Sequence, residues 1–419
     1  MKLADIFALV AGNDSDVEFI AYDGSRAGRP HSDVRIELRN PRAVSYFASS
    51  PGQLGLARAY VAGDVEIVGD VYTALSRLWD VRKPQVSMAD KAKIVRELAP
   101  FAIKRPEPPQ EEARVTRRQH TRKRDAEVIS HHYDVSNTFY EWVLGPSMAY
   151  TCAVYPTLDA SLEQAQEEKF DLVCRKLDLK PGMRVLDIGC GWGGFSIHAA
   201  KHYGVTTIGA TLSQQQAEYG QRRIEALGLS DQAQIRFSDY RAVQESGFDA
   251  VASIGLTEHI GSKNYPSYFS FIRTRLKPGG RLLNHCITRS DTKQRTQNIN
   301  GFINRYVFPD GELVPVSQIT EAIEQEQLEL QHTENLREHY AMTLRDWCQN
   351  LEDHWDEAVA EVGPGKARVW RLYMAASRVG FDRNVIQLHQ VLATRTDNEG
   401  DSGMPLRPQL ETRSVTPVF

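Results

Sequence analysis

The 419-residue chain has few cysteines and no long uncharged apolar run. The cysteines are scattered and form no C-x-x-C pair, which predicts reduced thiols and argues against a disulfide framework. No stretch approaches the roughly 18 uncharged apolar residues of a transmembrane helix. The N-terminus places Asp5 inside a short apolar run, unlike a signal peptide. We therefore expect a cytoplasmic protein that meets any membrane peripherally, at the inner leaflet.

A large excess of charge of either sign is also absent. The chain has 50 Lys and Arg residues and 54 Asp and Glu residues, a formal net charge of −4, which does not indicate a nucleic-acid partner. Apolar residues make up 41% and charged residues 25%, as in ordinary globular proteins, so intrinsic disorder is excluded. No H-E-x-x-H motif or Cys/His cluster indicates a metal site. At roughly 150 residues per domain, the length predicts two or three domains.

Composition divides the chain into four parts. They are a first unit at 1–104, a linker at 105–125, a larger domain at 126–395 and a flexible tail at 396–419. In the first unit, residues 34–38 alternate like a half-buried strand and 41–82 have mainly helical spacing. No acid, base and nucleophile group together there, so we expect a packing or substrate-presenting role. The tail is polar and rich in Pro and Gly.

The linker combines prolines with a dense basic cluster. Prolines at 106, 108 and 109 exclude a regular helix at its start. Six basic residues then follow: Arg114, Arg117, Arg118, Arg122, Lys123 and Arg124. The cluster is either a solvated linker or a contact with anionic phospholipid head groups, where each basic residue contributes about 1 kcal/mol. It has no interleaved aromatic residues, which weakens a single-stranded nucleic-acid interpretation.

Strands and helices alternate from about residue 165. The predicted strands are 184–189, 206–210, 234–237, 248–254 and 281–285, with gaps that leave room for helices. This spacing predicts a parallel, doubly wound α/β sheet. A stretch without sheet pattern follows at 289–325, then a helical region near 341–378. Residues 385–392 would form a closing strand.

A glycine-rich loop follows the first of these strands. Asp187 precedes Gly189, Gly191 and Gly194, which satisfy the G-x-G-x-x-G pattern of dinucleotide-binding proteins. That pattern also needs a carboxylate at the end of the second strand to hold the ribose. The second strand instead runs into 209–214, which contains no carboxylate. An acid just before the first glycine favours a methyltransferase that uses S-adenosylmethionine (SAM), with a nicotinamide-dependent oxidoreductase as the alternative.

Seven separated motifs carry a family resemblance. They are Leu54–Asp64, His132–Tyr140, Met148–Ala153, the glycine loop, Thr211–Gln216, Ile254–Gly261 and Phe302–Pro309. These motifs resemble the cyclopropane-fatty-acyl-phospholipid synthase family, whose members use SAM to methylate the double bond of an unsaturated acyl chain. The resemblance implies a seven-stranded, mainly parallel methyltransferase sheet with a smaller mixed α/β N-terminal domain. It also implies a phospholipid membrane surface as partner, and a homodimer.

The resemblance implies a SAM site built from several segments. Tyr150 and Thr151 would lie over the cofactor, Asp187, Gly189, Gly191 and Trp192 at its methionine end, Thr211, Leu212 and Gln216 at its ribose, and Asp239 and Tyr240 beside its adenine. Thr151 replaces a serine that is usual in the family and keeps the hydroxyl.

The implied reaction also needs a base. Methyl transfer to an alkene leaves a carbocation that must lose a proton, and the resemblance implies a bound bicarbonate ion as the acceptor. The matching positions are Cys152, Glu258, His285, the backbone of Ile287, and Tyr340. The carboxylate and imidazole would orient the anion, and the phenol and thiol would complete its hydrogen bonds. The aromatic faces of Phe302 and Tyr306 would stabilise the cation.

Two products share this first step. Direct proton loss with ring closure gives a cyclopropane, whereas a preceding hydride shift gives an exocyclic methylene branch. Leu256 and Thr257 replace the Met-Phe pair usual before Glu258, and 284–287 also departs from the common pattern. Together with the C-terminal motif at 388–393, these features resemble actinobacterial synthases of 10-methylene-stearoyl lipids. A separate reductase converts the methylene product of those enzymes to the methyl branch. We predict the methylene product, with cyclopropane formation as the alternative; the rival from another class is a non-catalytic lipid-binding protein.

Overall fold

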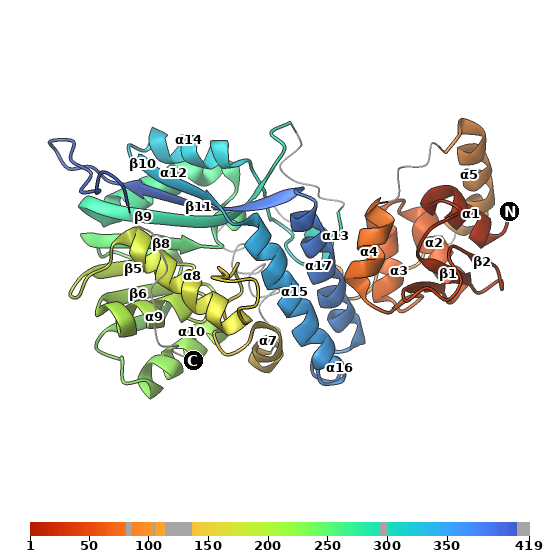
Figure 1. The fold of residues 1–419 in the computed structure, drawn as a ribbon, viewed down its shortest axis with the longest axis horizontal. Helices are drawn as coiled ribbons and strands as arrows, with labels where there is room; N and C mark the ends of the chain where they lie inside the picture. The colour runs from red at the N-terminus through yellow and green to blue at the C-terminus, as the bar shows by residue number, and fades with distance from the viewer. Residues whose placement is uncertain (81–85, 104, 114–135, 294–300, 409–419) are drawn as a thin grey trace. The chain divides into compact units, whose positions relative to one another are not determined.

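The computed structural model describes residues 1–80, 86–103, 105–113, 136–293 and 301–408. The basic cluster at 114–124 and the start of the 132–140 motif lie outside these ranges. The chain forms two compact units (Figure 1), the first from the described parts of Met1–Val115, Asn298–Pro309 and Leu351–Val379, and the second from the described remainder. The first unit thus includes two segments that the sequence-based division counts with the larger domain. The domain boundaries themselves stay predictions.

The first unit contains a four-stranded mixed sheet in the order β2-β1-β3-β4. Its strands are β1 (Glu18–Ala21), β2 (Arg26–Ala27), β3 (Arg35–Leu38) and β4 (Val65–Val68), and its N-terminal helices are α1 (Leu3–Ala11), α2 (Pro41–Ser49), α3 (Gln53–Val61), α4 (Val71–Asp80) and α5 (Met88–Ile103). The later segments add α13 (Phe302–Tyr306) and α16 (Trp355–Val362). The core joins Phe19 and Leu38 of the sheet to Val44 and Tyr46 of α2. A small mixed α/β unit is therefore confirmed.

One strand of this unit departs from the prediction. The spacing of apolar residues predicts helix over 41–82. Helices α2, α3 and α4 confirm most of this prediction, but strand β4 lies between α3 and α4. Val65 and Ile67 are buried whereas Glu66 is partly exposed, which is the alternation of a strand with one face on the core. β4 pairs antiparallel with β3, the strand predicted at 34–38. The alternation of buried and exposed residues in β4 covers only four residues. It was too short to be recognised between two segments with helical spacing.

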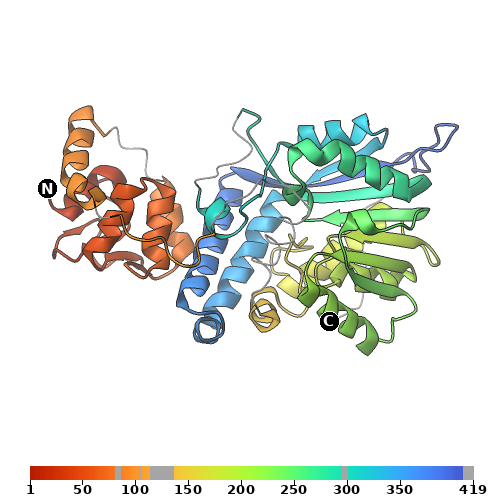
Figure 2. The same cartoon turned by 180° about the vertical axis from the view of Figure 1, so that it is seen from behind.

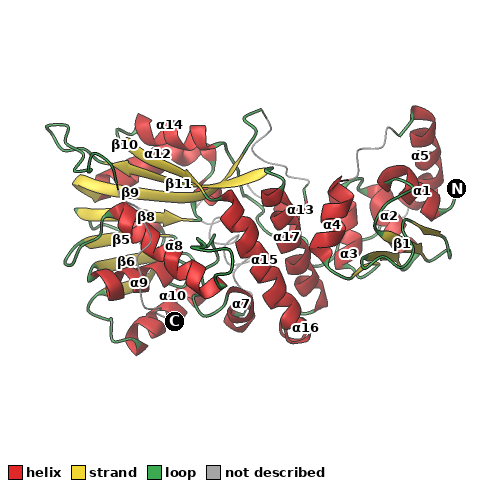
Figure 3. Cartoon of the chain, viewed as in Figure 1, coloured by secondary structure: helices red, strands yellow, loops and turns green. Residues whose placement is uncertain are grey.

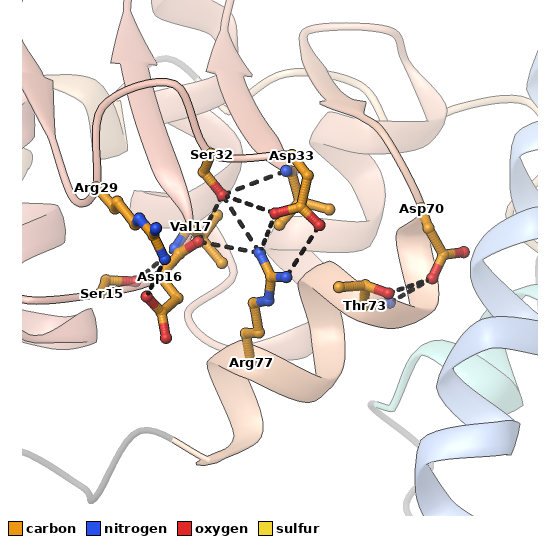
Figure 4. Close-up of polar contacts among 10 residues, drawn as sticks. Ser15, Asp16, Val17, Arg29, Ser32, Asp33, Asp70, Thr73 and Arg77 are labelled. Carbon is orange, nitrogen blue, oxygen red and sulfur yellow. Dashed lines mark hydrogen bonds and ion pairs between the residues drawn. The ribbon is translucent and has the colours of Figure 1, made fainter.

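A surface network ties α4 to the loops around β1 and β3. The guanidinium of Arg77 pairs with both carboxylate oxygens of Asp33, at 2.6 and 3.0 Å, and donates to the backbone carbonyl of Asp16 at 3.2 Å (Figure 4). At the start of the helix, the Asp70 carboxylate accepts a hydrogen bond from the backbone N–H of Thr73 at 2.8 Å. Exposed ion pairs contribute little stability individually, so the network mainly fixes the position of α4.

The second unit is built on a seven-stranded sheet in the order β10-β11-β9-β8-β5-β6-β7. The strands are β5 (Arg184–Ile188), β6 (Thr206–Thr211), β7 (Ala233–Phe237), β8 (Phe248–Ile254), β9 (Leu276–Arg289), β10 (Glu329–Asn335) and β11 (Ile386–Thr394). β11 runs antiparallel to both of its neighbours, and the other adjacent pairs are parallel. The predicted doubly wound, mainly parallel sheet is confirmed.

Helices cover both faces of this sheet (Figures 1 and 2). One face carries α8 (Leu162–Leu177), α9 (Gly194–Tyr203) and α10 (Gln214–Ala226), and the other carries α12 (Tyr265–Arg275) and α14 (Val316–Gln325). Val185 and Leu186, adjacent on β5, enter the two separate cores. Figure 3 shows the strands in yellow between the red helices. The remaining helices of this unit include α7 (Asn137–Leu144), α11 (Thr257–Ile260) and most of α15 (Arg337–Asp353), whereas α17 (Pro364–Asp382) lies mainly in the first unit.

The strand predictions fail at one edge of the sheet. The strands predicted from 184 to 285 and at 385–392 are all present, and 341–378 is helical as expected. β10 was not predicted because Glu329–Asn335 is mostly polar. It lies at the end of the strand order and pairs only with β11, so its sequence carries no buried alternation.

The order of the strands also locates the site. β5 lies between β6 and β8. From β5 the chain adds β6 and β7 on one side and then crosses back to add β8 and β9 on the other, so the strand order reverses beside β5. Ligands of open α/β sheets bind at such a switch point, outside the carboxyl ends of the strands. Among the described helices, none combines the length and apolar character needed to cross a bilayer.

Candidate active site

The glycine loop between β5 and α9 exposes backbone at the carboxyl edge of the sheet. Gly189 and Gly191 have φ angles of +73° and +55°, which side chains other than glycine's rarely tolerate. No atom lies within 4 Å of a Cβ built on Gly191, which faces open pocket space. A ligand can therefore approach the peptide groups of this loop closely.

Two pockets adjoin along this loop. The larger, of about 860 Å³, and the smaller, of about 550 Å³, share Gly189, Gly191, Gln216 and Gly255 in their linings. The predicted ribose and adenine residues Thr211, Leu212, Gln216 and Tyr240 line the larger pocket. The predicted methionine-end residues Tyr150, Thr151, Asp187 and Trp192 line the smaller one. Two joined compartments lined by different residues suit a ligand with two unlike ends.

Asp239 is the predicted cofactor residue that neither lining includes. Its carboxylate accepts hydrogen bonds from the backbone N–H of Arg241 at 2.9 Å and from its Nε at 2.7 Å. Ser238 and Tyr240, on either side, line the larger pocket. A contact between Asp239 and adenine stays a prediction.

A buried carboxylate and a buried ammonium meet the smaller pocket. Burial raises the pKa of Asp187 to about 7, against the stabilising effects of a 2.8 Å hydrogen bond from Ser196 and of the Lys169 charge. Burial lowers the pKa of Lys169 to about 7, and its ammonium donates to Thr151 Oγ1 at 3.1 Å. The methionine part of SAM carries an ammonium and a carboxylate, so both charges have a counterpart in that ligand.

Aromatic rings enclose the same end of the site. The indole of Trp192 donates to Asn137 Oδ1 at 2.9 Å, and its ring centroid lies 4.7 Å from that of Tyr140. The Tyr150 ring lies 5.4 Å from that of Trp347. Trp192 and Tyr150 line the smaller pocket, and the buried rings of Tyr140 and Trp347 pack against them.

Glu258 and Ile287 are directly joined. The backbone N–H of Ile287 on β9 donates to Glu258 Oε1 at 2.7 Å. The second carboxylate oxygen, Oε2, is buried and has no hydrogen-bond partner among the described residues. Burial raises the pKa of Glu258 to about 7, although the bond from Ile287 favours the ionised form. Near neutral pH this group exists both as a carboxyl and as a carboxylate.

His285 lies two residues before Ile287, on the same side of β9. Its Nδ1 is 3.2 Å from Nε2 of Gln390, and its own Nε2 is buried without a described hydrogen-bond partner. Burial, reinforced by the charges of Lys169 and Lys176, holds the pKa of His285 well below its usual range. The imidazole is therefore neutral. Its carbonyl accepts a 2.8 Å bond from Gly255, which lines both pockets, so the histidine adjoins the cofactor site.

Cys152 and the backbone of Tyr340 share one carbonyl as a partner, and a contact between the Tyr340 phenol and Cys152 stays a prediction. The backbone N–H of Tyr340 donates to the carbonyl of Leu336 at 3.1 Å, and Cys152 Sγ lies 3.7 Å from the same oxygen. Burial raises the pKa of the Cys152 thiol, so this group is a neutral donor. Lys169 lies close enough to lower the pKa of both Cys152 and His285, which links this pair to the histidine.

Phe302 and Tyr306, predicted to face a cation, lie on α13 in the first unit. Their ring centroids are 5.4 Å apart, and the Tyr306 hydroxyl donates to Glu112 at 3.2 Å. Their role toward the substrate stays a prediction.

A family model described as mycolic acid cyclopropane synthetase matches residues 120–391. This range includes both pockets and the seven-stranded sheet up to Val391 in β11. The chain belongs to this family.

Two named relatives align with two thirds or more of the chain. The chain is 55% identical to the probable fatty acid methyltransferase Rv3720 of Mycobacterium tuberculosis, over 97% of this chain and 98% of that protein. It is 37% identical to the cyclopropane-fatty-acyl-phospholipid synthase of Escherichia coli K12, over 67% of this chain and 71% of that protein.

Solved structures of cyclopropane synthases match nearly two thirds of the chain. MmaA2 of M. tuberculosis is 31% identical with a TM-score of 0.61, over 64% of this chain and 98% of MmaA2. CmaA1, solved with S-adenosylhomocysteine (SAH) and CTAB, is 29% identical with a TM-score of 0.61, over 64% of this chain and 97% of CmaA1. Together with the family match, these results show that the chain is a SAM-dependent methyltransferase, and the nicotinamide alternative is excluded.

Sequence reasoning missed two buried side chains of the synthase, Lys169 and Gln390. A signal existed for the lysine, because it follows Leu162 and Ala165 at helical spacing along the apolar stripe of α8. A charge at such a position is either paired or functional. Gln390 had no comparable signal, since its importance depends on a strand pairing.

One group of potential metal ligands lies outside the site. In the described part of the synthase, ligand atoms of Glu167, His198 and His202 lie within 4.8 Å of one another. Glu167 and His198 Nδ1 already share a 2.9 Å hydrogen bond. We assign no metal to this cluster.

Proposed function

We propose that the synthase transfers the SAM methyl group to the double bond of an oleoyl-type phospholipid chain and forms a 10-methylene branch. One observation carries this proposal. Beside the cofactor pocket, Glu258 Oε2 and His285 Nε2 are buried polar atoms without a described partner. Buried polar groups are rarely left unsatisfied, so they indicate a small ligand between the cofactor and the substrate.

These residues fit a bicarbonate ion. The neutral His285 offers a donor, and Glu258 offers either a donor or an acceptor because its pKa is about 7. The one S–H of Cys152 faces the Ala153 carbonyl at 3.1 Å, so it would have to turn to reach the anion. A permanently ionised carboxylate would repel the anion, and the raised pKa removes that conflict. When bound, bicarbonate would supply a base for the proton that the methylated chain loses.

The chain's own residues provide the other requirements of the reaction. An isolated alkene is a weak nucleophile, so it must be held in line with the methyl group, away from water. The aromatic wall around Trp192 and Tyr140 keeps the methionine end of the cofactor fixed. Glu258 is held by the Ile287 N–H and His285 by Gln390, so neither has to reorganise during proton transfer.

The methylene product is favoured over the cyclopropane by a connected set of residues. Thr257 donates to Asn284 at 2.5 Å, and Asn284 Nδ2 lies 3.3 Å from Cys286 Sγ. These are the positions at which the sequence departs from the usual family pattern around Glu258 and His285. Three departures that contact one another form one local adaptation, which agrees with the sequence resemblance to methylene-forming synthases on which this product is proposed. A methylene product would require a reductase to complete the methyl branch.

We also propose that the synthase meets its substrate at a phospholipid surface. Helix α5 exposes Met88, Val95 and Ile103, at 79%, 67% and 84% of their surface. Lys91 and Lys93 are exposed on the same helix. Apolar and basic side chains together are typical of helices that lie on anionic bilayers. The homodimer implied by the resemblance stays a prediction.

The product of the reaction tests the proposal. The enzyme is incubated with SAM and oleoyl phospholipid vesicles, and the modified chain is examined by NMR, since the two products have equal mass. Vinylidene protons are expected, and high-field ring protons would instead establish cyclopropane formation. Glu258→Gln should lower turnover by 10²- to 10⁴-fold, the usual contribution of an acid–base group, while SAM binding by calorimetry is retained.

The control is Glu338→Gln, which removes an exposed carboxylate on α15 and should leave turnover unchanged. Full turnover of Glu258→Gln would contradict the assignment of the anion site. SAM binding without any change in the lipid would instead support a non-catalytic lipid-binding protein.

A further inference from the structure

We propose that Lys176, acting through Gln390, holds His285 in the tautomer that carries its proton on Nε2, so that this nitrogen donates to the bound anion. This inference deepens the proposed function and rests on the anion site beside Glu258. Lys176 and Gln390 are positioning residues, because neither reaches the reacting atoms. Two contacts and one strand pairing carry the inference.

The first contact orients the side-chain amide of Gln390. The ammonium of Lys176 lies 2.7 Å from Gln390 Oε1. An ammonium group has only donors, so the atom facing it must be the amide oxygen and not the NH₂ group. The orientation of this amide, which the positions of its atoms alone seldom decide, is therefore fixed by chemistry.

The second contact fixes the tautomer of His285. With its oxygen toward the lysine, Gln390 presents its NH₂ group to His285 Nδ1 at 3.2 Å. The NH₂ group can only donate, so Nδ1 must accept and carries no proton. A neutral imidazole has one N–H, which is then on Nε2. That nitrogen is the buried atom that lacks a described hydrogen-bond partner.

The sheet places these groups in one row. Gln390 on β11 is the cross-strand partner of His285 on β9, and on its other side the partner of Glu334 on β10. Directly opposed residues share a face of the sheet, so the three side chains stand beside one another. Lys176 reaches this row from α8, which covers that face. The arrangement is a property of the fold and does not depend on a mobile loop.

Glu334 keeps the lysine charged. The side chain of Lys176 is fully buried, and burial lowers its pKa, whereas the ion pair with the Glu334 carboxylate raises it. A neutral amine has a lone pair and could accept a hydrogen bond, which would allow Gln390 to turn over. The half-exposed carboxylate at the sheet edge therefore helps to define the proton position on His285.

The tautomer can be measured directly. In the full-length enzyme labelled with ¹⁵N-histidine, NMR should show an unprotonated Nδ1 and a protonated Nε2 for His285, assigned by the loss of its signals in His285→Asn. Gln390→Glu places a carboxylate, an acceptor, beside Nδ1 and should move the proton there. Turnover should fall 10- to 100-fold, the range seen when the outer partner of a functional histidine is lost, with SAM affinity unchanged.

Matched variants separate positioning from structural damage. Gln387→Glu introduces the same charge on β11, away from His285, and should change neither the tautomer nor turnover. Lys176→Met should give mixed tautomers, and Lys176→Arg should restore most of the activity because it still only donates.

Several results would overturn the inference. They are a proton on Nδ1 in the wild-type enzyme, an unchanged tautomer in Gln390→Glu, and full turnover with the proton moved. The tautomer measurement needs neither SAM nor lipid. If Glu258→Gln stays active while His285 shows the expected tautomer, the proposed function fails and the positioning of the histidine stands.

Discussion

Glu258 is subject to two opposing effects. Burial disfavours its ionised form, while the hydrogen bond from the Ile287 N–H favours it, and the balance leaves the pKa at about 7. An exposed glutamate ionises near pH 4.3. The same side chain can therefore release and accept a proton under neutral conditions, which an ordinary surface carboxylate cannot do.

The raised pKa predicts a limb of the pH profile near neutrality. Because the protonated form of Glu258 is the one that does not repel the anion, turnover should fall as the pH rises through about 7. Asp187 and Lys169 titrate in the same range, so turnover is measured at saturating SAM. The residual activity of Glu258→Gln should not show this limb. A limb that persists in the variant would assign it to another group.

At this scale, what could be predicted depends on local patterns. Asp187 and the glycines were identifiable because a loop that binds a cofactor needs them in sequence order. Glu258 and His285 followed from the family resemblance, although only the fold brings Glu258 of α11 into contact with β9. Gln390 could not be predicted, because its effect requires the register between β9 and β11.

Helix α11 and strand β9 are joined by more than the Glu258 contact. Thr257, the first residue of α11, is fully buried and donates to Asn284 of β9. Asn284 and His285 point to opposite faces of the strand, so the threonine secures the helix from the side away from the anion site. The position of Glu258 therefore depends on both faces of β9.

Removing this hydroxyl should destabilise the protein. Thr257→Val keeps the shape of the side chain but leaves a buried Asn284 oxygen without its donor, which costs about 1–3 kcal/mol. The free energy of unfolding is measured in urea. Thr320→Val, on an exposed part of α14, is the matched control and should change stability by less than about 0.5 kcal/mol. An equally small effect at Thr257 would show that Asn284 finds another partner.

The elements that were predicted and those that were missed differ in burial. The central strands are short apolar runs because helices cover them on both faces, so they were identifiable in isolation. β10 is polar because only one of its edges is paired, and β4 is a four-residue interruption among helices. Both segments form strands because they pair with a neighbouring strand, β10 with β11 and β4 with β3. A single sequence does not show these pairings.

At the scale of the whole molecule, the proposed phospholipid substrate would require a surface that binds a bilayer. The helix α5 packs through Leu98 and Phe101 onto the first unit, and its other side exposes basic and apolar residues together. A helix that contacts only water gains no stability from large apolar side chains that are 67–84% exposed. This face is the part of the described structure that best fits a membrane contact.

Neutralising α5 should weaken vesicle binding. Lys91→Gln with Lys93→Gln should lower affinity for anionic phospholipid vesicles by roughly tenfold or more, since each basic side chain near such a surface contributes about 1 kcal/mol. Affinity is measured by co-sedimentation at low salt, and the difference should shrink as salt rises. Lys180→Gln with Lys201→Gln, on the second unit, is the control. Equal losses in both double variants would indicate a non-specific charge effect.

The discontinuity of the first unit affects how the protein is made. Arg368 binds the Glu66 carboxylate on β4 and the carbonyl of Tyr60, residues that leave the ribosome about 300 positions earlier. Arg305 likewise pairs with Glu112. Domains usually fold in the order in which they are synthesised. Here the N-terminal segment emerges first, yet it acquires its last contacts only after nearly the whole of the second unit has been translated.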